Sequence, residues 1–212
     1  MTRFARIAYT EAVLRAQEEN GSAAVGLRTL LHGGGDGPDP LGPDEAAFIT
    51  ARDGFYMATV GETGWPYMQY RGGPPGFLRV VDRHTLAFAD VRGNRQYITV
   101  GNLSGNDRVA LFFMDYAHRT RLKVYGHASV RGVEEEPALA ALLAEQGTDG
   151  RVERLVVIKV EGMNWNCPQH ITPRYTEQEL GEALAPVREH ILRLEEENER
   201  LRALLADREN TP

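Results

Sequence analysis

The sequence predicts a mainly β protein of the α+β class, with an antiparallel barrel, peripheral helices and a helical tail. Three observations carry this prediction. Runs of strand-like residues follow one another through the middle of the chain, mostly with short loops between them. Two helical patterns interrupt these runs, and a heptad repeat rich in leucine occupies the end of the chain. Strands joined by short loops favour an antiparallel barrel with helices packed outside it.

The composition is that of an ordinary globular protein. The 212 residues, 42% hydrophobic and 25% charged, suit one domain with appendages. The chain has no apolar run of the roughly 18 to 20 residues that a spanning helix needs, and its first residues lack the apolar stretch of a signal peptide. We therefore expect a cytoplasmic protein without a membrane partner. The single cysteine, Cys167, fits a reducing compartment. A net charge of -6 argues against nucleic acid as a partner, so any anion site should be local.

Residues 1–43 are expected to hold a helix and a linker. Thr10 can cap a short amphipathic helix within residues 9–31. Glycine and proline fill the stretch 32–43, which is typical of a surface linker. A second helix is predicted in GPDEAAFITARD, where Pro43 stands in the first turn beside acidic residues that favour the positive end of the dipole.

The barrel domain is predicted over residues 44–176. Its extended runs are FYMATV, WPYMQYR, GFLRVVD, TLAFADV, RVALFFMDY, RTRLKVYGHASV and RLVVIKVEGMN. The loops GETG, DRH and Asp115–His118 join the first six runs into three hairpins. Helices are predicted from near Asn94 and in EEEPALAALLAEQ.

Residues 177–212 form a predicted coiled-coil-like helical tail. Spacings of four and three residues alternate through the a and d positions of heptads, occupied by Leu180, Leu184, Val187, Ile191, Leu194, Asn198, Leu201 and Leu205. Pro186 interrupts the pattern, so we expect the continuous helix to begin there. A polar Asn198 at an a position specifies parallel pairs in coiled coils. The stripe predicts pairing between subunits; the alternative is a helix whose leucines lie against their own domain.

The stretch ADVRGNRQYITVGN is the strongest candidate for a site. A strand there turns into a helix, so backbone N–H groups and the positive end of a helix dipole face the loop, with Asn94 as the expected cap. Arg92 and Arg95 add guanidinium groups suited to phosphate oxygens. The pattern favours a bound phosphate. The alternative is that both arginines pair with surface acids and Asn94 only caps the helix.

Two further clusters point to ligand contact. In WPYMQYRGGPPG the glycines and prolines let a flat ligand approach the backbone, and alternation places Gln69 and Arg71 on one strand face and Tyr70 on the other. In MNWNCPQHITPRY, Trp165 and Arg174 lie in an irregular segment typical of binding loops. The histidines do not fall at the spacings of a zinc site, so no metal is expected.

The order of these motifs resembles the flavin-binding split-barrel proteins related to pyridoxamine 5'-phosphate oxidase. The resemblance spans about Thr10 to Arg174 and is closest to the branch known only as predicted flavin-nucleotide-binding proteins. It implies an antiparallel split β-barrel, flavin mononucleotide (FMN) as cofactor and a small-molecule substrate. It also implies a homodimer with the flavin at the subunit interface.

The resemblance also implies which residues contact FMN. The strand that runs along the flavin matches Met68, Gln69, Tyr70 and Arg71. The phosphate loop matches Asp90, Val91, Arg92, Asn94 and Arg95. Arg121 stands where the family has a glutamine, and Trp165 and Arg174 match a tryptophan and an arginine that reach the cofactor. No catalytic residue is assigned.

The leading hypothesis is therefore an FMN-dependent oxidoreductase. Before its carboxyl end the oxidase has a segment of the form RLHDR, and this chain has CPQHITPR instead, so the hypothesis names no substrate. One alternative is a flavin-binding or flavin-sensing module without turnover. Another is a split barrel that holds a deazaflavin or a haem, and for haem His127 or His170 would be the axial ligand.

Overall fold

The computed structural model describes residues 2–24, 26–27, 37–145, 147, 150–165 and 169–209. The chain divides into two units. The first comprises Met1–Asp115 and Arg119–His170, and the second comprises Tyr116–His118 and Ile171–Pro212. Cys167 and residues 32–36 of the expected linker lie outside the described residues.

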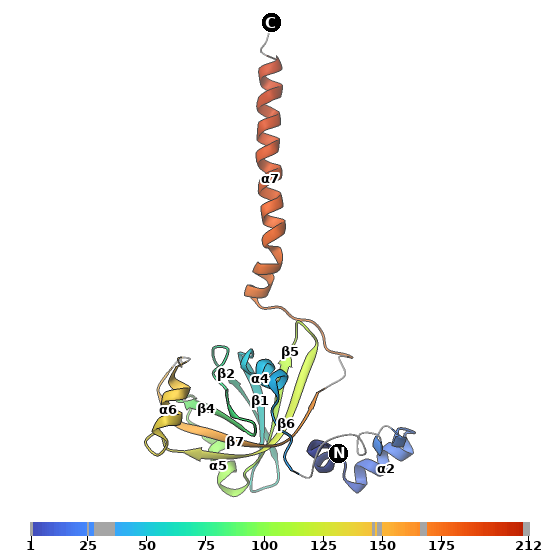
Figure 1. Cartoon of the computed structure of the whole chain (residues 1–212), viewed down its shortest axis with the longest axis vertical. Coiled ribbons are helices and arrows are strands. Elements are labelled where there is room, and N and C mark those ends of the chain that lie inside the picture. Colours follow the sequence, from blue (N-terminus) through green and yellow to red (C-terminus); the bar gives the residue numbers. More distant parts are fainter. Residues whose placement is uncertain are drawn as a thin grey trace. The chain divides into compact units, whose positions relative to one another are not determined.

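The first unit is built on one seven-stranded sheet with the order β2-β1-β5-β6-β7-β4-β3 (Figure 1). The strands are β1 (Gly54–Val60), β2 (Pro66–Gly72), β3 (Arg79–Asp82), β4 (Thr85–Val91), β5 (Arg108–Asp115), β6 (Thr120–Arg131) and β7 (Val152–Trp165). Each neighbouring pair is antiparallel. All seven predicted runs form strands, and the three predicted hairpins are confirmed as β1–β2, β3–β4 and β5–β6.

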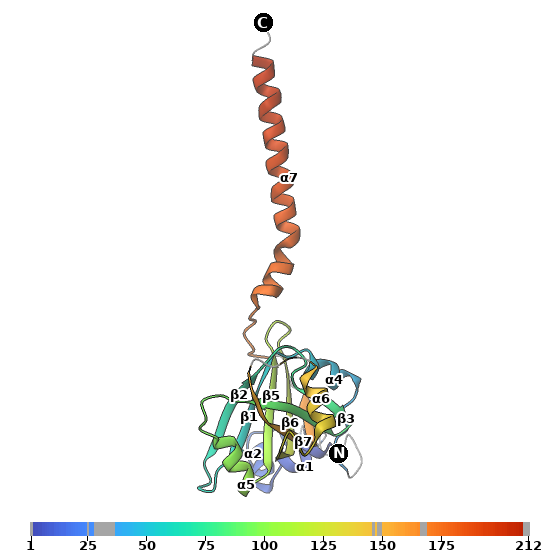
Figure 2. The same ribbon diagram turned by 90° about the vertical axis from the view of Figure 1, so that its left-hand side faces the viewer.

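The sheet curls without closing, because β2 and β3 remain its two edges (Figures 1 and 2). Register shifts bend it between Tyr125 and Gly126 on β6 and between Asp90 and Val91 on β4. A Cβ at Gly126 would lie 2.5 Å from the carbonyl oxygen of Lys159, so only glycine lets β7 approach this closely. The fold class is confirmed as an antiparallel split β-barrel with peripheral helices.

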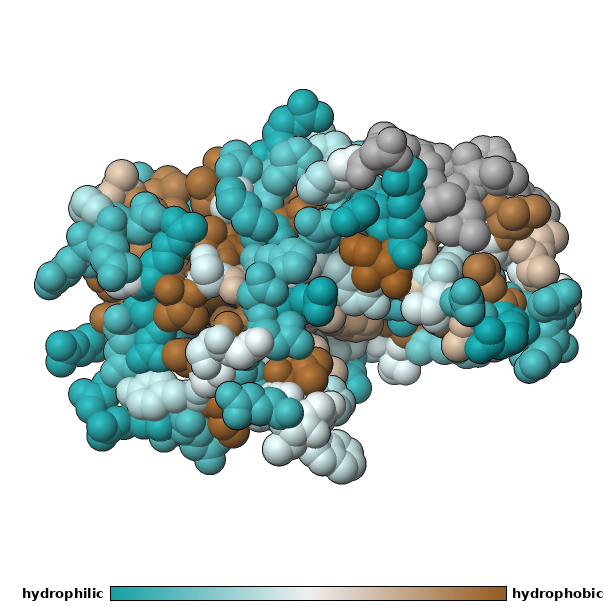
Figure 3. All heavy atoms as spheres, turned by 90° about the horizontal axis from the view of Figure 1, so that it is seen from below, coloured by the Kyte–Doolittle hydropathy of each residue, from teal (hydrophilic) through white to brown (hydrophobic). Residues whose placement is uncertain are grey.

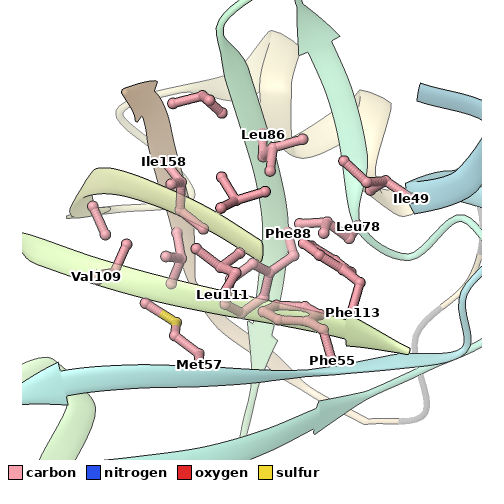
Figure 4. Packing of buried hydrophobic residues seen from close by; sticks show 14 of the residues in the cluster. Ile49, Phe55, Met57, Leu78, Leu86, Phe88, Val109, Leu111, Phe113 and Ile158 are labelled. Carbon is pink, nitrogen blue, oxygen red and sulfur yellow. The ribbon is translucent and has the colours of Figure 1, made fainter. Parts of the chain in front are cut away.

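The core fills the inside of the curled sheet. Alternate residues of β1 and β5 point inward, as strand geometry requires. Phe55 meets the rings of Phe77, Phe88 and Phe113, at centroid distances of 5.8, 5.6 and 5.2 Å, and Figure 4 shows the buried side chains converging from several strands. Aromatic pairs at such distances add to the burial of apolar area.

The helices whose bounds are described are α1 (Arg3–Ala8), α2 (Glu11–Glu19), α4 (Pro43–Thr50), α5 (Ile98–Gly105), α6 (Pro137–Ala144) and α7 (Glu177–Glu209). Thr10 caps α2 as predicted, since its side chain accepts from Val13 N at 3.4 Å. Pro43 opens α4 as predicted. Helix α1 was not predicted. It is a short helix held by distant contacts, because the carboxylate of Asp39 accepts from the backbone N–H of Arg3 at 2.9 Å.

The start of α7 corrects the sequence prediction. The helix begins at Glu177 and contains Pro186, instead of beginning there. The true start is a capping box, in which Glu179 N donates to Thr176 Oγ1 at 3.1 Å and Thr176 N donates to Glu179 Oε2 at 2.7 Å. These bonds fix the first turn, and the helix continues through an exposed proline that lacks one backbone donor.

None of the helices within the described ranges combines the length and the apolarity needed to cross a membrane. Figure 3 shows one face of the molecule, on which apolar side chains form separate patches bordered by hydrophilic ones. Apolar atoms contribute more than half of the accessible surface of folded proteins, so patches of this kind are ordinary.

Candidate functional site

A buried ion pair joins two strands that are not neighbours in the sheet. Arg71 of β2 reaches across to Asp90 of β4, with 2.7 Å between Nη1 and Oδ1. The two side chains are only 18% and 10% exposed. Arg154 of β7, directly opposite Asp90 in the ladder, lies 3.8 Å from the other carboxylate oxygen. Two arginines therefore neutralise the carboxylate of Asp90. The ion pair with Asp90 in turn holds Arg71 between β2 and β4, on the side where the barrel is not closed.

A bulge in β7 adds a second carboxylate beside this pair. Asp90 faces Arg154 and Val91 faces Val152, so Glu153 is the extra residue between them. Its carboxylate accepts from Arg154 Nη2 at 2.6 Å and from the Tyr97 hydroxyl at 3.1 Å. Bulges commonly redirect a side chain next to a site, and here the bulge places Glu153 against the loop that follows β4.

The loop after β4 does not have the expected helix start. The sequence predicts Asn94 as the cap, but Asn94 Oδ1 accepts from Gln96 N at 3.1 Å in a turn inside the loop. Helix α5 begins only at Ile98, and its cap residue is Tyr97, which gives no side-chain cap. Asn94 does not cap the helix, because its side-chain oxygen already accepts a hydrogen bond within the turn. The first-turn N–H groups of α5 therefore donate no hydrogen bond to the side chain of the cap residue.

The two arginines of the loop differ in what they contact. Arg92 Nε lies 3.6 Å from Glu153 Oε1, so the surface-pair alternative holds for this residue. Arg95 has a left-handed backbone, with φ at 63°, and its exposed side chain makes no hydrogen bond or ion pair with any described residue. A bulky residue adopts this conformation only where its surroundings impose it. Arg95 is the cation of this loop that no described residue neutralises.

The charges around the loop sum to a positive excess. Two carboxylates face four guanidinium groups; the carboxylates are Asp90 and Glu153, and the guanidinium groups are Arg71, Arg92, Arg95 and Arg154. The Nε of Arg71 is buried and has no hydrogen-bond partner among the described residues. A buried donor without an acceptor normally finds one in a ligand or in water, so Arg71 keeps an unsatisfied donor in the wall of this site.

Two cavities meet at Arg71. The wider one, about 350 Å³, is lined by glycine, proline and aromatic residues that include Tyr70, Phe77 and Phe88. The smaller one, about 60 Å³, is lined mostly by polar residues, among them Arg95. They share four residues, which are Arg71, Asp90, Val91 and Gly93. The wider cavity falls in the size range of small-ligand pockets, about 300 to 1,000 Å³, and it opens beside a cationic cavity.

A tight turn shapes the wall of the wider cavity. Phe77 N donates to Pro74 O at 2.9 Å, and Gly76 has a φ of 87°. With proline at the second position and glycine at the third, this is a type II turn, which requires glycine at the third position. The turn brings Phe77 into the core against Phe55 and leaves Gly73 with no room for a side chain, because a Cβ there would lie 2.7 Å from Phe77 Cγ.

The remaining predicted residues lie partly elsewhere. Gln69 lines the polar cavity and accepts from the Tyr67 hydroxyl at 2.8 Å, whereas Met68 is 65% exposed on the opposite strand face. Arg121 lies over the ring of Phe112. Trp165 donates to Glu45 Oε1 at 2.7 Å. Neither Arg121 nor Trp165 lines the two cavities.

Arg174 belongs to the second unit, where its guanidinium lies over the ring of Tyr116 at 5.1 Å. His127, the residue considered as a haem ligand, lies 2.9 Å from Asp107 through Nδ1 and lines a separate cavity of about 520 Å³. Within the described ranges, no three His, Cys, Asp or Glu side chains gather in a way that could hold a metal ion.

Sequence reasoning missed three residues of this site. Arg154, Glu153 and Tyr97 surround the loop, but the first two come from a strand more than fifty positions later in the chain. Only the register of β4 against β7 places these two residues beside the loop. A pattern of neighbouring residues in the sequence does not reveal that register. The sequence pattern places Tyr97 inside a helix, whereas α5 begins one residue after it.

The fold and these cavities together define a split-barrel protein with a cationic cavity at the open side of its barrel. The family model described as pyridoxamine 5'-phosphate oxidase matches residues 41–166. The chain belongs to the pyridoxamine 5'-phosphate oxidase family, and the resemblance found in the sequence is confirmed.

Several solved structures are similar to this chain. HupZ of group A Streptococcus is 18% identical, with 62% of this chain and 98% of that chain covered and a TM-score of 0.45. A proposed pyridoxamine 5'-phosphate oxidase of Lactobacillus delbrueckii is 20% identical, with coverages of 59% and 94% and a TM-score of 0.46. An FMN-binding protein of Syntrophomonas wolfei is 13% identical, with coverages of 57% and 83% and a TM-score of 0.44. A comparison with curated proteins found no match.

Proposed function

We propose that the protein is an FMN-dependent oxidoreductase acting on a small molecule, with the flavin phosphate held by the DVRGNR loop, residues 90–95. One observation carries the proposal. A wide apolar cavity and a small cationic cavity share Arg71 and Gly93, which is the arrangement that a planar ring joined to a phosphate requires. Membership of the oxidase family supports a flavin as the occupant.

The phosphate would be held by groups that lack partners among the described residues. Arg95 offers a free guanidinium, Arg71 offers its buried Nε, and the first turn of α5 offers backbone N–H groups. A helix N-terminus and charge-assisted hydrogen bonds both favour a phosphate at such a place. Asp90 does not oppose this binding, because Arg71 and Arg154 already neutralise it.

The ring would lie in the wider cavity, against Tyr70, Phe77 and Phe88. Bound FMN supplies the electron and hydride chemistry, and the protein supplies orientation and the exclusion of water. Hydride transfer to a flavin demands no catalytic acid or base, so the chain needs none at this position. The aromatic walls would hold the ring flat, and Gly72 and Gly73 would leave the backbone accessible to it.

We further propose a homodimer in which a second copy completes the site. Arg121 and Trp165 do not line the cavities of their own chain, although they are neighbours, since Trp165 pairs with Leu122 across β6 and β7. As the family resemblance implies, they would contact the flavin bound mainly by the other chain, together with Arg174.

The first experiment is the visible absorption spectrum of the purified protein, followed by identification of the chromophore released on denaturation. Stoichiometric FMN, or stoichiometric binding of added FMN, is expected. A released deazaflavin or haem would contradict the choice of cofactor, and so would a colourless protein that fails to bind FMN. Anaerobic reduction of the bound flavin by nicotinamide donors then separates an oxidoreductase from a module that binds flavin without turnover.

A further inference from the structure

Helix α7 carries an apolar stripe that is exposed over its whole described length. It has 33 residues, and Val187, Ile191, Leu194 and Leu201 remain between 49% and 51% exposed. With Asn198 between Leu194 and Leu201, these positions recur at alternating spacings of four and three, which places them in one seam along a helix. Large side chains in such a seam need a partner surface.

We propose that α7 pairs with α7 of a second copy as a parallel, in-register coiled coil. The charges beside the seam favour this partner. In a parallel pair, a g residue faces the e residue of the next heptad on the other helix. Glu197 at g would face Arg202 of the second copy, and His190 at g would face Glu195. An antiparallel pair brings g to g and e to e and would form other charge pairs, such as Glu195 with Arg202, so the choice of the parallel pair rests on Asn198.

Asn198 fixes the register. In a parallel in-register pair its amide faces the equivalent amide of the second copy, whereas a slip of one heptad sets it against Ile191 or Leu205. In the single chain, Asn198 Nδ2 donates to the Leu194 carbonyl at 3.1 Å, and its Oδ1 is available to the equivalent amide. A buried polar a residue of this kind is the best-attested device for specifying a parallel two-stranded pair.

The charge of the same helix opposes binding to an anionic partner. Acidic residues outnumber arginines along it, which opposes both anionic lipids and nucleic acid. Glu197 already lies 3.8 Å from Arg200 of its own helix. That exposed pair is worth little, so Glu197 is free to turn toward a second helix.

The coil is expected to be weak as an isolated element. From Val187 onward it offers about three heptads, near the lower limit for a coiled coil, and Pro186 lies just before them. A test should therefore trap the pair in the full chain instead of relying on the association of a peptide.

Disulfide trapping in the full-length protein provides this test. In a Cys167→Ser background, Val187→Cys and Leu201→Cys each introduce one thiol at a d position, and Glu196→Cys introduces one at an outward f position. Under a glutathione redox buffer, we expect both d variants to form disulfide-linked dimers and the f variant to give only background. Trapping at one d position only would indicate an antiparallel pair, and trapping at neither would exclude the coil; either result overturns the proposal.

Charge-reversal variants test whether the disulfide-linked dimers arise from the proposed coiled coil. In the Leu201→Cys background, Arg202→Glu should lower the yield of linked dimer, because it places a like charge opposite Glu197 of the second copy. Adding Glu197→Arg should restore the lost dimer. Loss without rescue would overturn the predicted pairing. The FMN absorbance of these variants is a separate readout, since the coil does not rest on the proposed function.

Discussion

Arg92 and Arg95 lie in one loop, yet only Arg95 has a charge that no described residue meets. We expect Arg95→Ala to remove a charge-assisted contact worth about 1.5 to 3 kcal/mol, which weakens FMN binding by about one to two decades. Titration followed by flavin fluorescence measures the change. Unchanged affinity would mean that the phosphate is held elsewhere.

Arg119 offers a matched control for this change. It is also an exposed arginine in the left-handed region, with φ at 53°, but it lies in the β5–β6 turn. Arg119→Ala repeats the chemical change and the backbone context of Arg95→Ala without touching either cavity. We expect it to leave the affinity for FMN unaltered. Arg71→Ala is a poorer test, because it would leave the buried Asp90 with a lost partner and destabilise the barrel.

Asp82 at the end of β3 should contribute to stability in a pH-dependent way. Its carboxylate accepts from His84 N and from the Thr85 hydroxyl, both at 2.7 Å, and these bonds lower the pKa of Asp82 below its ordinary value. A lowered pKa contributes stability above the unfolded-state pKa, and this contribution is lost as the pH falls through the folded-state pKa.

The variant Asp82→Asn tests this expectation. Wild type should be the more stable protein near neutral pH, and the two melting temperatures should converge as the pH falls below about 4. Thermal denaturation across the pH range measures both. A difference that stays constant down to the most acidic conditions would assign the effect to something other than the charge of Asp82.

At the scale of elements, the type II turn between β2 and β3 depends on close packing at Gly73. A Cβ added there would lie 2.7 Å from Phe77 Cγ. We expect Gly73→Ala to displace Phe77 and to cost about 1 to 3 kcal/mol, as overpacking typically does. Chemical denaturation measures the loss. Gly93→Ala is the matched control, because a Cβ at Gly93 would meet open space; an equal loss at both positions would contradict the steric explanation.

The strands were predictable because their signals are local. Alternation along β1 and β5 and the turn residues between hairpins are visible in a few neighbouring positions. Helix starts were harder, since a start depends on which side chain is free to cap. Asn94 looked like a cap but serves a turn, whereas the capping box of Thr176 and Glu179 begins α7 ahead of a proline that appeared decisive.

The candidate site was predictable only in part, because some of its residues stand in local motifs and others reach it through long-range strand pairing. Arg95 and Arg71 stand in short motifs that suggest anion and flavin contacts. Arg154 and Glu153 reach the loop only because β7 pairs with β4 and carries a bulge there. Long-range register decides which charges are already satisfied, and a single sequence does not contain that information.

At the scale of the whole molecule, pairing of the tails should strengthen the retention of FMN when the protein is dilute. If two copies share each flavin and α7 pairs them, the coil acts as a tether that raises the effective concentration of one barrel near the other. Deleting residues 177–212 should leave a folded barrel that releases FMN on dilution sooner than the full chain does. Flavin fluorescence on serial dilution measures this, and equal retention would contradict either the shared site or the tether.

The contact between Arg71 and Asp90 joins two strands that exchange no backbone hydrogen bonds. Parting them breaks side-chain contacts and leaves every ladder of the sheet intact, so it should need far less free energy than unfolding. Amide protons of β2 should accordingly exchange faster with solvent than those of β6, which has a strand on either side, and bound FMN should slow this exchange. Because the barrel is not closed, a separation of β2 from β4 would open a route by which the ring of the proposed flavin could reach its cavity without unfolding of the sheet.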